Sequence, residues 1–244
     1  MNGANALIQS LVDQGIKAIL GIPGGVMIPI YDALYDRKDI KNFLMRHEQG
    51  AAHAADGYSR ATGKLGVCFG TSGPGATNLV TGIATAYMDS IPMLAITGQV
   101  KTTALGKDSF QEADIAGITM PVTKHNYLVK DVESLPRIIA EAVYVATTGR
   151  PGPVLVDIPM DISLSHIDYK PVHDVSMRGY DPELVIDDSA IAEAIELINK
   201  SERPVLYVGG GIISAGASEE LIKLSEKTHI LVTTTLLGKG SIPE

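Results

Sequence analysis

Four short apolar runs, separated by segments with helical spacing, constrain the fold of this chain more than any other feature. The runs are "KAILGI", "KLGVCFG", "PMLAITG" and "GPVLVDIP". Between and before them apolar residues recur at helical spacing, as at Leu7, Ile8, Leu11 and Val12. Strands that are apolar throughout and alternate with helices are typical of a parallel sheet with both faces covered. The sequence therefore predicts an α/β fold with a doubly wound parallel sheet and helices on both faces.

This periodic pattern is lost twice along the chain. An irregular region separates "PMLAITG" from the helical pattern "VESLPRIIAEAVYVATT", and the pattern fades again at 166–187. The second region scatters Pro, His, Asp and Tyr without a period, which is typical of a linker. Only two helix and two strand patterns follow, whereas sheets usually have about five strands. We expect a domain at 1–165, a linker at 166–187 and an incomplete Rossmann-like α/β domain at 188–244.

Composition excludes several classes of function. The chain has 244 residues and a formal net charge of -8, which argues against nucleic-acid binding because that requires a basic surface. No apolar run approaches the length of a membrane span, and the N-terminus lacks the pattern of a signal peptide. Cys68 lies within the apolar run "LGVCF", which favours a buried thiol. A cytoplasmic protein without membrane or nucleic-acid partners is expected.

Three glycine-rich segments each follow a predicted strand: "GIPGG", "GTSGPGATN" and "VGGGIISAG". Glycine allows a tight turn and lets a ligand approach the backbone closely. None matches a named motif; in the second segment Asn78 stands where G-x-G-x-x-G requires its third glycine. One such turn is more often structural than functional. Three of them at strand ends favour a ligand site, because α/β sheets bind ligands outside the carboxyl ends of their strands.

The segment "MRHEQGAAH" places Glu48 between two histidines. A zincin motif needs H-E-x-x-H, whereas His47 and His53 are six positions apart and lie on different faces of a helix. The spacing therefore excludes this type of zinc site, and we expect no metal ligands in the chain. Glu48 either stabilises a helix N-terminus through the macrodipole or acts chemically at the end of a strand. The spacing alone leaves both alternatives open.

The joined segments "GIPGG", "RHEQGAAHAADGYSRATGKLGVCFGTSGPGATN", "SFQE" and "GRPGPVLVDIP" resemble thiamine-diphosphate-dependent enzymes. Within them the chain is most similar to the large, catalytic subunits of acetolactate (acetohydroxyacid) synthases. The resemblance implies an enzyme of branched-chain amino-acid biosynthesis that condenses two pyruvates, or pyruvate with 2-ketobutyrate, and releases CO₂. It implies thiamine diphosphate, Mg²⁺ and a structural FAD as cofactors. It also implies a 2-keto-acid substrate, a homodimer or tetramer formed across the pyrimidine domain, and a regulatory small subunit.

The resemblance assigns roles to residues in matching motifs. Glu48 would hydrogen-bond N1′ of the aminopyrimidine and so promote removal of the proton from C2 of the thiazolium. Gly24 and Gly25 would pass over the thiazolium, where a side chain at Gly25 would block the reaction. Phe110 would line the substrate pocket, and Gln111 would bond the reacting groups. Further cofactor contacts are implied at Pro74 and Asn78 for the aminopyrimidine, and at Arg150, Gly209, Gly210, Gly211, Thr235 and Leu236 for FAD.

Two features depart from the family. Met160 follows "DIP", where the family commonly has a lysine near the substrate entrance, so the preferred second keto acid stays open. The sequence also contains no G-D-G motif, which in the family holds Mg²⁺ and the diphosphate in a third domain. The resemblance therefore implies that the chain carries the pyrimidine half of a site whose other half comes from another subunit. We expect a truncated chain that is inactive by itself.

Three other functions compete with this interpretation. The chain could belong to another thiamine-diphosphate-dependent 2-keto-acid decarboxylase, oxidase or carboligase, although "SFQEAD" and the short linker favour an acetolactate synthase. A non-catalytic partner that keeps a half-site is the second, and the missing third domain supports it. A nicotinamide dehydrogenase is poorly supported, because the dinucleotide fingerprint fails in two segments.

Overall fold

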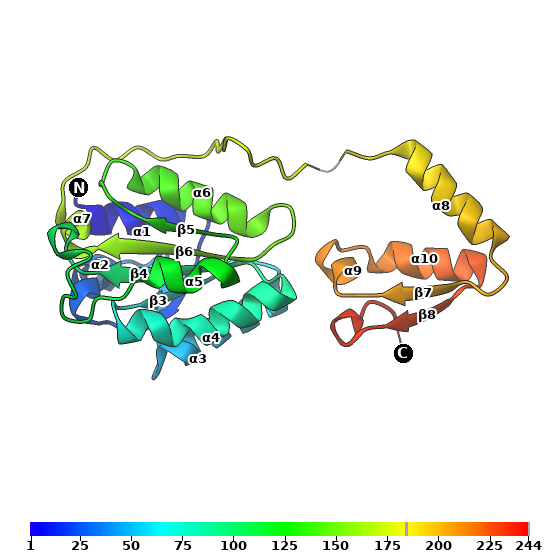
Figure 1. Ribbon diagram of the computed structural model, residues 1–244, viewed down its shortest axis with the longest axis horizontal. Helices are drawn as coiled ribbons and strands as arrows, with labels where there is room; N and C mark the ends of the chain where they lie inside the picture. The colour runs from blue at the N-terminus through cyan, green and yellow to red at the C-terminus, as the bar shows by residue number, and fades with distance from the viewer. Residues whose placement is uncertain (184, 244) are drawn as a thin grey trace. The chain divides into compact units, whose positions relative to one another are not determined.

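The computed structural model describes residues 1–183 and 185–243 of the chain. They form two compact units, unit 1 from Met1 to Glu183 and unit 2 from Leu184 to Glu244 (Figure 1). Each unit has a parallel sheet of its own. Within the described ranges, none of the helices combines the length and the apolar character that crossing a membrane requires.

Unit 1 is built on a six-stranded sheet in the order β2-β1-β3-β4-β6-β5, and all neighbouring strands are parallel. The three strands β3, β4 and β6 are buried along their whole length, as their continuous apolar sequences predict. The predicted doubly wound parallel sheet is therefore confirmed. The strands are β1 Ala18–Gly21, β2 Lys41–Leu44, β3 Gly66–Gly70, β4 Met93–Gln99, β5 His125–Leu128 and β6 Pro153–Pro159.

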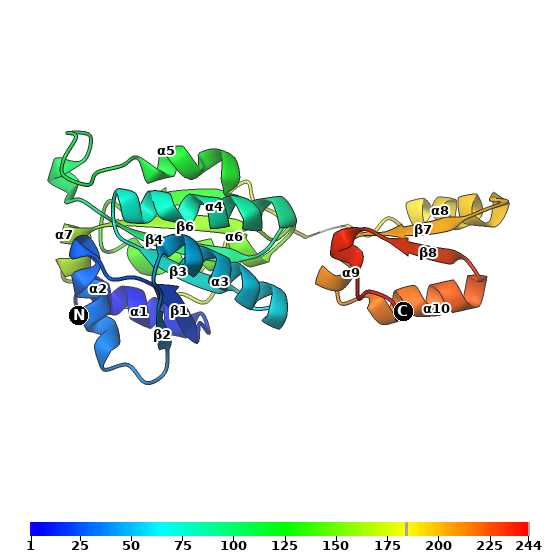
Figure 2. The same ribbon diagram turned by 90° about the horizontal axis from the view of Figure 1, so that it is seen from below.

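Helices cover both faces of this sheet (Figure 2). One face carries α1 Gly3–Asp13, α2 Ile28–Tyr35 and α6 Leu135–Thr147, and the other carries α3 Glu48–Thr62, α4 Pro74–Asp89 and α5 Ile115–Thr119. Short helical turns complete the unit: η1 Gly25–Met27, η2 Thr102–Ala104, η3 Met120–Val122 and α7 Met160–Leu164.

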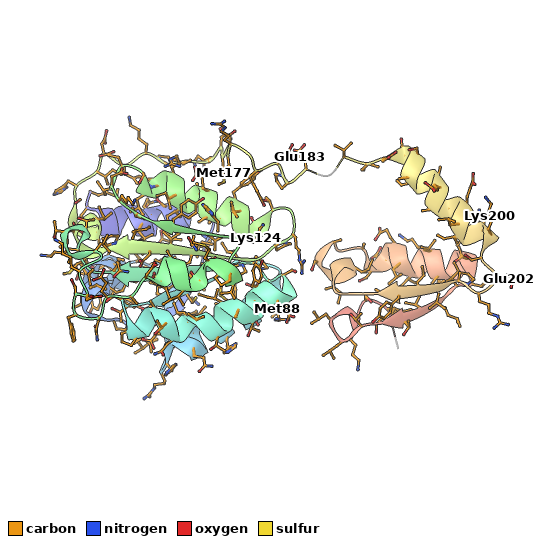
Figure 3. The ribbon with its side chains drawn as sticks, in the orientation of Figure 1. Met88, Lys124, Met177, Glu183, Lys200 and Glu202 are labelled. Carbon is orange, nitrogen blue, oxygen red and sulfur yellow. The ribbon has the colours of Figure 1, made fainter. Side chains whose placement is uncertain are left out.

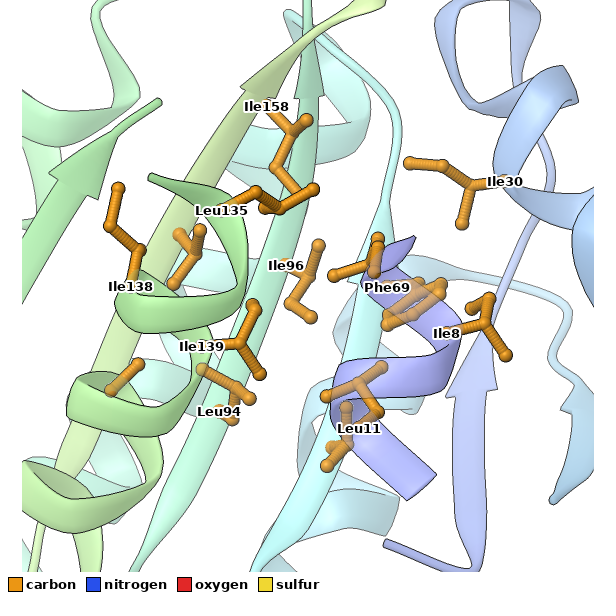
Figure 4. Close-up of a cluster of buried hydrophobic side chains, with 14 of the residues drawn as sticks. Ile8, Leu11, Ile30, Phe69, Leu94, Ile96, Leu135, Ile138, Ile139 and Ile158 are labelled. Carbon is orange, nitrogen blue, oxygen red and sulfur yellow. The ribbon is translucent and has the colours of Figure 1, made fainter. Parts of the chain in front are cut away.

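Each face of the sheet has its own hydrophobic core. On one face Phe69, Leu94 and Ile96 pack with Leu11 and Ile139 (Figure 4). Each such fully buried side chain stabilises the fold by roughly 2 kcal/mol. On the other face, small residues of α3 and α4 pack over Cys68 and its neighbours, and Cys68 is buried as predicted. Burial raises the pKa of the Cys68 thiol to about 12, so this cysteine is an inert core residue.

The glycine-rich turn after β3 is shorter than the sequence predicts. Helix α4 already begins at Pro74, so most of "GPGATN" is helical. Proline suits the first turn of a helix, because the N–H that it lacks has no partner there. Asn78 consequently lies on a helix rather than in a turn.

The region expected to be irregular, between β4 and α6, contains regular elements. It forms α5 and then β5, which pairs with β6 at the edge of the sheet. The strand has only four residues, starts with His125 and is not fully buried. Such a short, half-polar segment lacks the kind of apolar run that predicted β1, β3, β4 and β6.

The first part of the predicted linker packs against unit 1. The Tyr169 hydroxyl donates to Asp13 Oδ2 at 2.6 Å, and Tyr180 donates to the carbonyl oxygen of Thr148 at 3.0 Å. The ammonium group of Lys124, labelled in Figure 3, donates to the same Thr148 oxygen at 2.9 Å. Met177 packs against the core of unit 1. Residues 166–183 are therefore held by the first domain.

Unit 2 has a two-stranded parallel sheet of β7 Val205–Val208 and β8 Leu231–Thr234. Its helices are α8 Asp188–Lys200, α9 Gly211–Ser214 and α10 Ser218–Thr228, with a final turn η4 at Leu236–Gly238. Asp187 caps α8 by accepting from the N–H groups of Ser189 and Ala190. Apolar side chains such as Leu197 and Tyr207 stay exposed. The unit therefore buries little apolar surface, as expected for a small part of a sheet.

Candidate functional site

The carboxyl ends of the parallel strands in unit 1 lie at one edge of the sheet. The loop after β1 contains Gly24 and Gly25, the chain after β2 leads into Glu48, and the chain after β3 leads into Pro74. The carboxyl end of β4 lies at the same edge. Parallel strands thus bring together residues that are far apart in sequence, at the edge where α/β sheets bind ligands.

Glu48 is the first residue of α3 and is half-buried. The helix begins there because the His47 side chain accepts a hydrogen bond from the Gln49 N–H at 3.1 Å. The positive end of the helix dipole also favours a carboxylate in this first turn. Asn78 Nδ2 on α4 donates to Glu48 Oε2 at 3.0 Å. Glu48 and Asn78, to which the family resemblance assigns contacts with the same cofactor ring, are therefore joined by a hydrogen bond.

This contact depends on a close approach of α3 and α4. A Cβ added to Gly82 on α4 would lie 2.4 Å from the Cβ of Ala52 on α3, far inside van der Waals contact. Ala51, Ala52 and Ala55 are all buried. Small residues along both helices thus set the spacing that lets Asn78 reach Glu48.

Thr71 lies between two glycine backbones next to Glu48. A Cβ on Gly24 would lie 2.3 Å from Thr71 Cβ, and a Cβ on Gly75 would lie 2.6 Å from Thr71 Cγ2. The same Cβ added to Gly75 would lie 3.3 Å from Glu48 Oε1. Thr71 Oγ1 is buried and has no hydrogen-bond partner among the described residues. A buried hydroxyl without a partner is costly, so this cradle fits a ligand that brings hydrogen-bonding groups.

The loop that carries Phe110 and Gln111 reaches the same edge. A Cβ on Gly73 would lie 2.6 Å from the carbonyl oxygen of Gln111, so the two backbones are in direct contact. The Phe110 side chain is 87% exposed, and its role as a pocket residue stays a prediction. The loop therefore places the backbone of Gln111 beside Gly73, one residue before α4.

Arg150 does not join these residues. It precedes β6, at the amino ends of the strands, and its Nε donates to Ser90 Oγ at 2.7 Å just before β4. The amino and carboxyl ends of parallel strands lie at opposite edges of a sheet. The predicted flavin contact at Arg150 is thus separate from the Glu48 edge.

The remaining predicted flavin residues lie together in unit 2. Gly209 and Gly210 follow β7, and Gly211 begins α9. Thr235 follows β8, and its N–H donates to the Val208 carbonyl oxygen at 2.8 Å. Gly210 is close to this second loop, since an added Cβ would lie 3.2 Å from the Cβ of Leu237. Leu236 is 81% exposed.

Sequence reasoning missed a buried acid, Asp157 on β6. It is 2% exposed and accepts hydrogen bonds from Thr97 Oγ1 at 2.7 Å and Gln99 Nε2 at 2.9 Å. Burial raises the pKa of the Asp157 carboxyl to about 7, against the opposing effect of these two hydrogen bonds. The signal in the sequence was an acidic residue inside the otherwise apolar run "PVLVDIP".

Two further features bear on ligands. Residues 1–183 and 185–243 contain no cluster of three His, Cys, Asp or Glu side chains suited to a metal ion. A cavity of about 700 Å³ lies along the edge strand β2, and Pro23, the residue before Gly24, is part of its lining. It is lined by Tyr31, Leu34, Tyr35, Arg37, Lys38, Ile40, Lys41, Asn42 and Phe43, so it adjoins the Glu48 edge without including it.

Two family models match the chain. The model described as "Thiamine pyrophosphate enzyme, N-terminal TPP binding domain" matches residues 1–118. The model described as "Thiamine pyrophosphate enzyme, central domain" matches residues 191–244. The first covers every strand and helix that contributes to the Glu48 edge.

Curated proteins match over the whole chain. An acetolactate synthase of Arthrospira platensis is 57% identical, a probable acetolactate synthase large subunit of Methanocaldococcus jannaschii 54%, and an acetolactate synthase large subunit of Corynebacterium glutamicum 52%. The matches cover 100% of this chain but 43%, 42% and 39% of those proteins. The chain thus spans less than half the length of the curated relatives it matches.

Proposed function

The chain belongs to the thiamine pyrophosphate enzyme family, and on that premise we propose that it is the pyrimidine-binding part of a catalytic acetolactate synthase subunit. The complete enzyme would condense two pyruvates, or pyruvate with 2-ketobutyrate, and release CO₂. The observation that carries this proposal is the 3.0 Å hydrogen bond from Asn78 to Glu48 at the carboxyl edge of the sheet.

Glu48 would exchange a proton with a nitrogen of the cofactor's aminopyrimidine. Asn78 holds one carboxyl oxygen and leaves the other toward Gly75 and the cradle around Thr71. The N-terminus of α3 stabilises the charged form of the carboxyl when the proton has left. Bound thiamine diphosphate supplies an electron-withdrawing ring that stabilises charge on the substrate carbon from which CO₂ departs.

Glycines and the 109–112 segment would shape the space over the cofactor. An added Cβ on Gly25 meets nothing within 4 Å in the part of the chain that the structure describes, so a side chain there would meet open space. Gly24 and Pro74 would border the ring. Gln111 would hydrogen-bond the reacting keto acid, and Phe110 would cover its apolar part.

The other cofactors would involve this chain to different degrees. The described residues do not fit a metal site, and Mg²⁺ with the diphosphate would be held by residues outside the chain. The loops of unit 2 that contain Gly209, Gly210, Gly211, Thr235 and Leu236 would hold FAD in a structural role, and the family resemblance also assigns a flavin contact to Arg150. Three consecutive glycines after β7 give the close backbone access that a dinucleotide needs.

The same proposal includes partners and location. A second subunit would complete the cofactor site in a homodimer or tetramer formed across unit 1, and a regulatory small subunit would bind the assembly. The enzyme would act on 2-keto acids in the cytoplasm. The family resemblance supports these statements, and the words "large subunit" in the names of two relatives support an assembly of more than one kind of subunit.

One residue favours a second candidate function. Met160 begins α7 directly after β6, where acetolactate synthases commonly carry a lysine. Another thiamine-diphosphate-dependent decarboxylase, oxidase or carboligase would fit this difference. Product analysis of the complete enzyme with pyruvate separates the two: acetolactate supports the synthase, whereas acetaldehyde or acetate supports the alternative.

The direct test is Glu48→Gln in the complete enzyme that contains this chain. We expect turnover to fall by roughly 10²–10⁴-fold, because the amide keeps the shape of the side chain but cannot exchange the proton. Glu133→Gln, at an exposed carboxyl before α6, is the matched control. Unchanged turnover in Glu48→Gln would remove this residue from the mechanism.

A second test uses the 244-residue chain by itself. Isothermal titration with thiamine diphosphate and Mg²⁺ should give weak binding, because only the pyrimidine side of the site is present. Tight binding by the isolated chain would contradict the half-site proposal.

A further inference from the structure

The loop between β4 and α5, residues 100–114, carries Phe110 and Gln111 and is fastened by carboxylates. Asp161 accepts hydrogen bonds from the Thr102 N–H at 3.0 Å and from its hydroxyl at 2.5 Å. Glu112 accepts from the N–H groups of Gly106 at 2.5 Å and Ser109 at 2.8 Å. The Glu112 N–H also donates to the Ser109 carbonyl oxygen at 2.9 Å, which closes a turn around Gln111. These contacts shape the loop internally, and a further contact ties its end to the sheet.

Gln111 itself has a strained backbone. Its φ is +57°, in the left-handed region that costs a non-glycine residue about 1–2 kcal/mol. Its carbonyl oxygen would lie 2.6 Å from a Cβ added to Gly73, so the two backbones lie close together. Such a conformation persists only where surrounding contacts determine it. The turn from Ser109 to Glu112 supplies local contacts of this kind, and its position against Gly73 also depends on how the end of the loop is held.

Gln99, at the end of β4, ties the end of this loop to the sheet. It is 3% exposed, and its Nε2 donates to the carbonyl oxygen of Ala113 at 2.9 Å, two residues beyond Gln111. The same Nε2 donates to Asp157 Oδ2 at 2.9 Å, and Oε1 accepts from the Val100 N–H at 2.9 Å. Both ends of the amide are therefore engaged.

Asp157 decides which way this amide points. Asp157 Oδ2 accepts from the Gln99 amide, so the NH₂ group of Gln99 faces the carboxyl group. The reversed amide would place Oε1 against both Asp157 and the Ala113 oxygen, and Nε2 against the Val100 N–H. Thr97, directly opposite Asp157 in the sheet register, holds the other carboxyl oxygen.

We propose that Gln99, oriented by Asp157, is a positioning residue that keeps Gln111 in place against Gly73 through the carbonyl group of Ala113. Gln99 touches neither the cradle around Thr71 nor Glu48 directly and acts only through the loop. Its consequence for catalysis rests on the proposed function, whereas its effect on the loop does not.

The first experiment measures hydrogen–deuterium exchange of the loop amides in the 244-residue chain. Gln99→Met keeps the size of the side chain but removes its hydrogen bonds, and we expect exchange at 106–113 to become about fivefold faster, as loss of one hydrogen bond predicts. Gln14→Met is the matched control, since Gln14 also donates to a backbone carbonyl, that of Val172. Unchanged loop exchange in Gln99→Met would overturn the proposal.

Two more variants sharpen this test. Asp157→Asn can still accept from Gln99 and donate to Thr97, so its loop should exchange as in the wild type. In a Gln111→Gly background the backbone strain is gone, and Gln99→Met should then have a smaller effect. An equal effect in both backgrounds would contradict the link to Gln111. If Gln99→Met does not fold, Gln99→Asn replaces it, because its shorter amide cannot reach Ala113.

The second experiment measures kinetics in the complete enzyme. Gln99→Met should lower kcat/KM for the keto acid by about fivefold or more, through a raised KM, while affinity for thiamine diphosphate stays unchanged. Gln14→Met should change neither. Faster exchange of the loop amides in Gln99→Met, together with an unchanged kcat/KM, would overturn the positioning role of Gln99. Full activity of Glu48→Gln would instead refute the proposed function and leave the exchange result standing.

Discussion

At the scale of single residues, the candidate site depends on close backbone contacts that only glycine allows. Gly73 has a φ of +56°, and a Cβ added to it would lie 2.6 Å from the Gln111 carbonyl oxygen. Gly106, in the same region of the chain, has a φ of +72°, but an added Cβ there meets nothing within 4 Å among the described residues. A side chain at either glycine would therefore meet the same kind of backbone strain, and only at Gly73 would it also meet a steric clash.

This difference gives a prediction for alanine at each position. Gly73→Ala should lower the free energy of unfolding by roughly 2–4 kcal/mol, from backbone strain together with the clash. Gly106→Ala should lower it by only about 1–2 kcal/mol, from strain alone. Urea denaturation of both variants measures the difference, and equal losses would mean that the Gly73–Gln111 contact yields easily.

Asp157 predicts a pH dependence of stability. Burial raises the pKa of its carboxyl from 3.8 to about 7, and the nearby Asp114 carboxyl adds to the rise. The folded chain thus holds the proton more tightly than the unfolded chain. Its contribution to stability is complete below pH 3.8 and is lost as the pH rises through about 7.

Asp157→Asn should remove this dependence. Between pH 5 and pH 8 the free energy of unfolding should fall less in this variant than in the wild type, because the amide does not titrate. Urea denaturation at the two pH values measures both changes. Parallel curves for the two proteins would show that Asp157 titrates alike in the folded and unfolded chains.

At the scale of elements, the spacing of α3 and α4 sets the distance between Glu48 and Asn78. Gly82→Ala should force the helices apart, because its Cβ would lie 2.4 Å from that of Ala52. We expect a destabilisation of roughly 1–3 kcal/mol. Gly57→Ala is the control on α3: its Cβ meets nothing within 4 Å in the described chain, and alanine is the better helix former by about 1 kcal/mol.

Thermal denaturation distinguishes these two variants. Gly82→Ala should lower Tm and Gly57→Ala should raise it slightly. A Gly82→Ala variant as stable as the wild type would show that α3 and α4 can separate without cost, and the spacing argument for Asn78 and Glu48 would fail.

At the scale of the whole molecule, the boundary between the two units can be tested by truncation. A fragment of residues 1–183 should unfold at the same temperature as unit 1 in the whole chain. A fragment of residues 1–165 should be less stable, because it loses the hydrogen bonds of Tyr169 to Asp13 and of Tyr180 to Thr148. Calorimetry of both fragments checks this, and equal stability would place the boundary at 165.

The sequence by itself determined the class of fold, the order of most elements and the resemblance to thiamine-diphosphate enzymes, which the family matches confirm. Apolar runs and helical spacing are local patterns, so they can be read without knowing what packs against what. The cap of α3 is also local, since the His47 side chain accepts from the Gln49 N–H next to Glu48.

Only the tertiary structure decided which of these residues meet. Glu48 and Asn78 are 30 positions apart, Gln99 and Asp157 are 58 apart, and no local pattern predicts either hydrogen bond. The buried state of Asp157 likewise depends on the register of β4 and β6 and on the loop above them. Contacts between distant segments arise from the packing of the whole sheet, and for that reason the site became visible only in the folded chain.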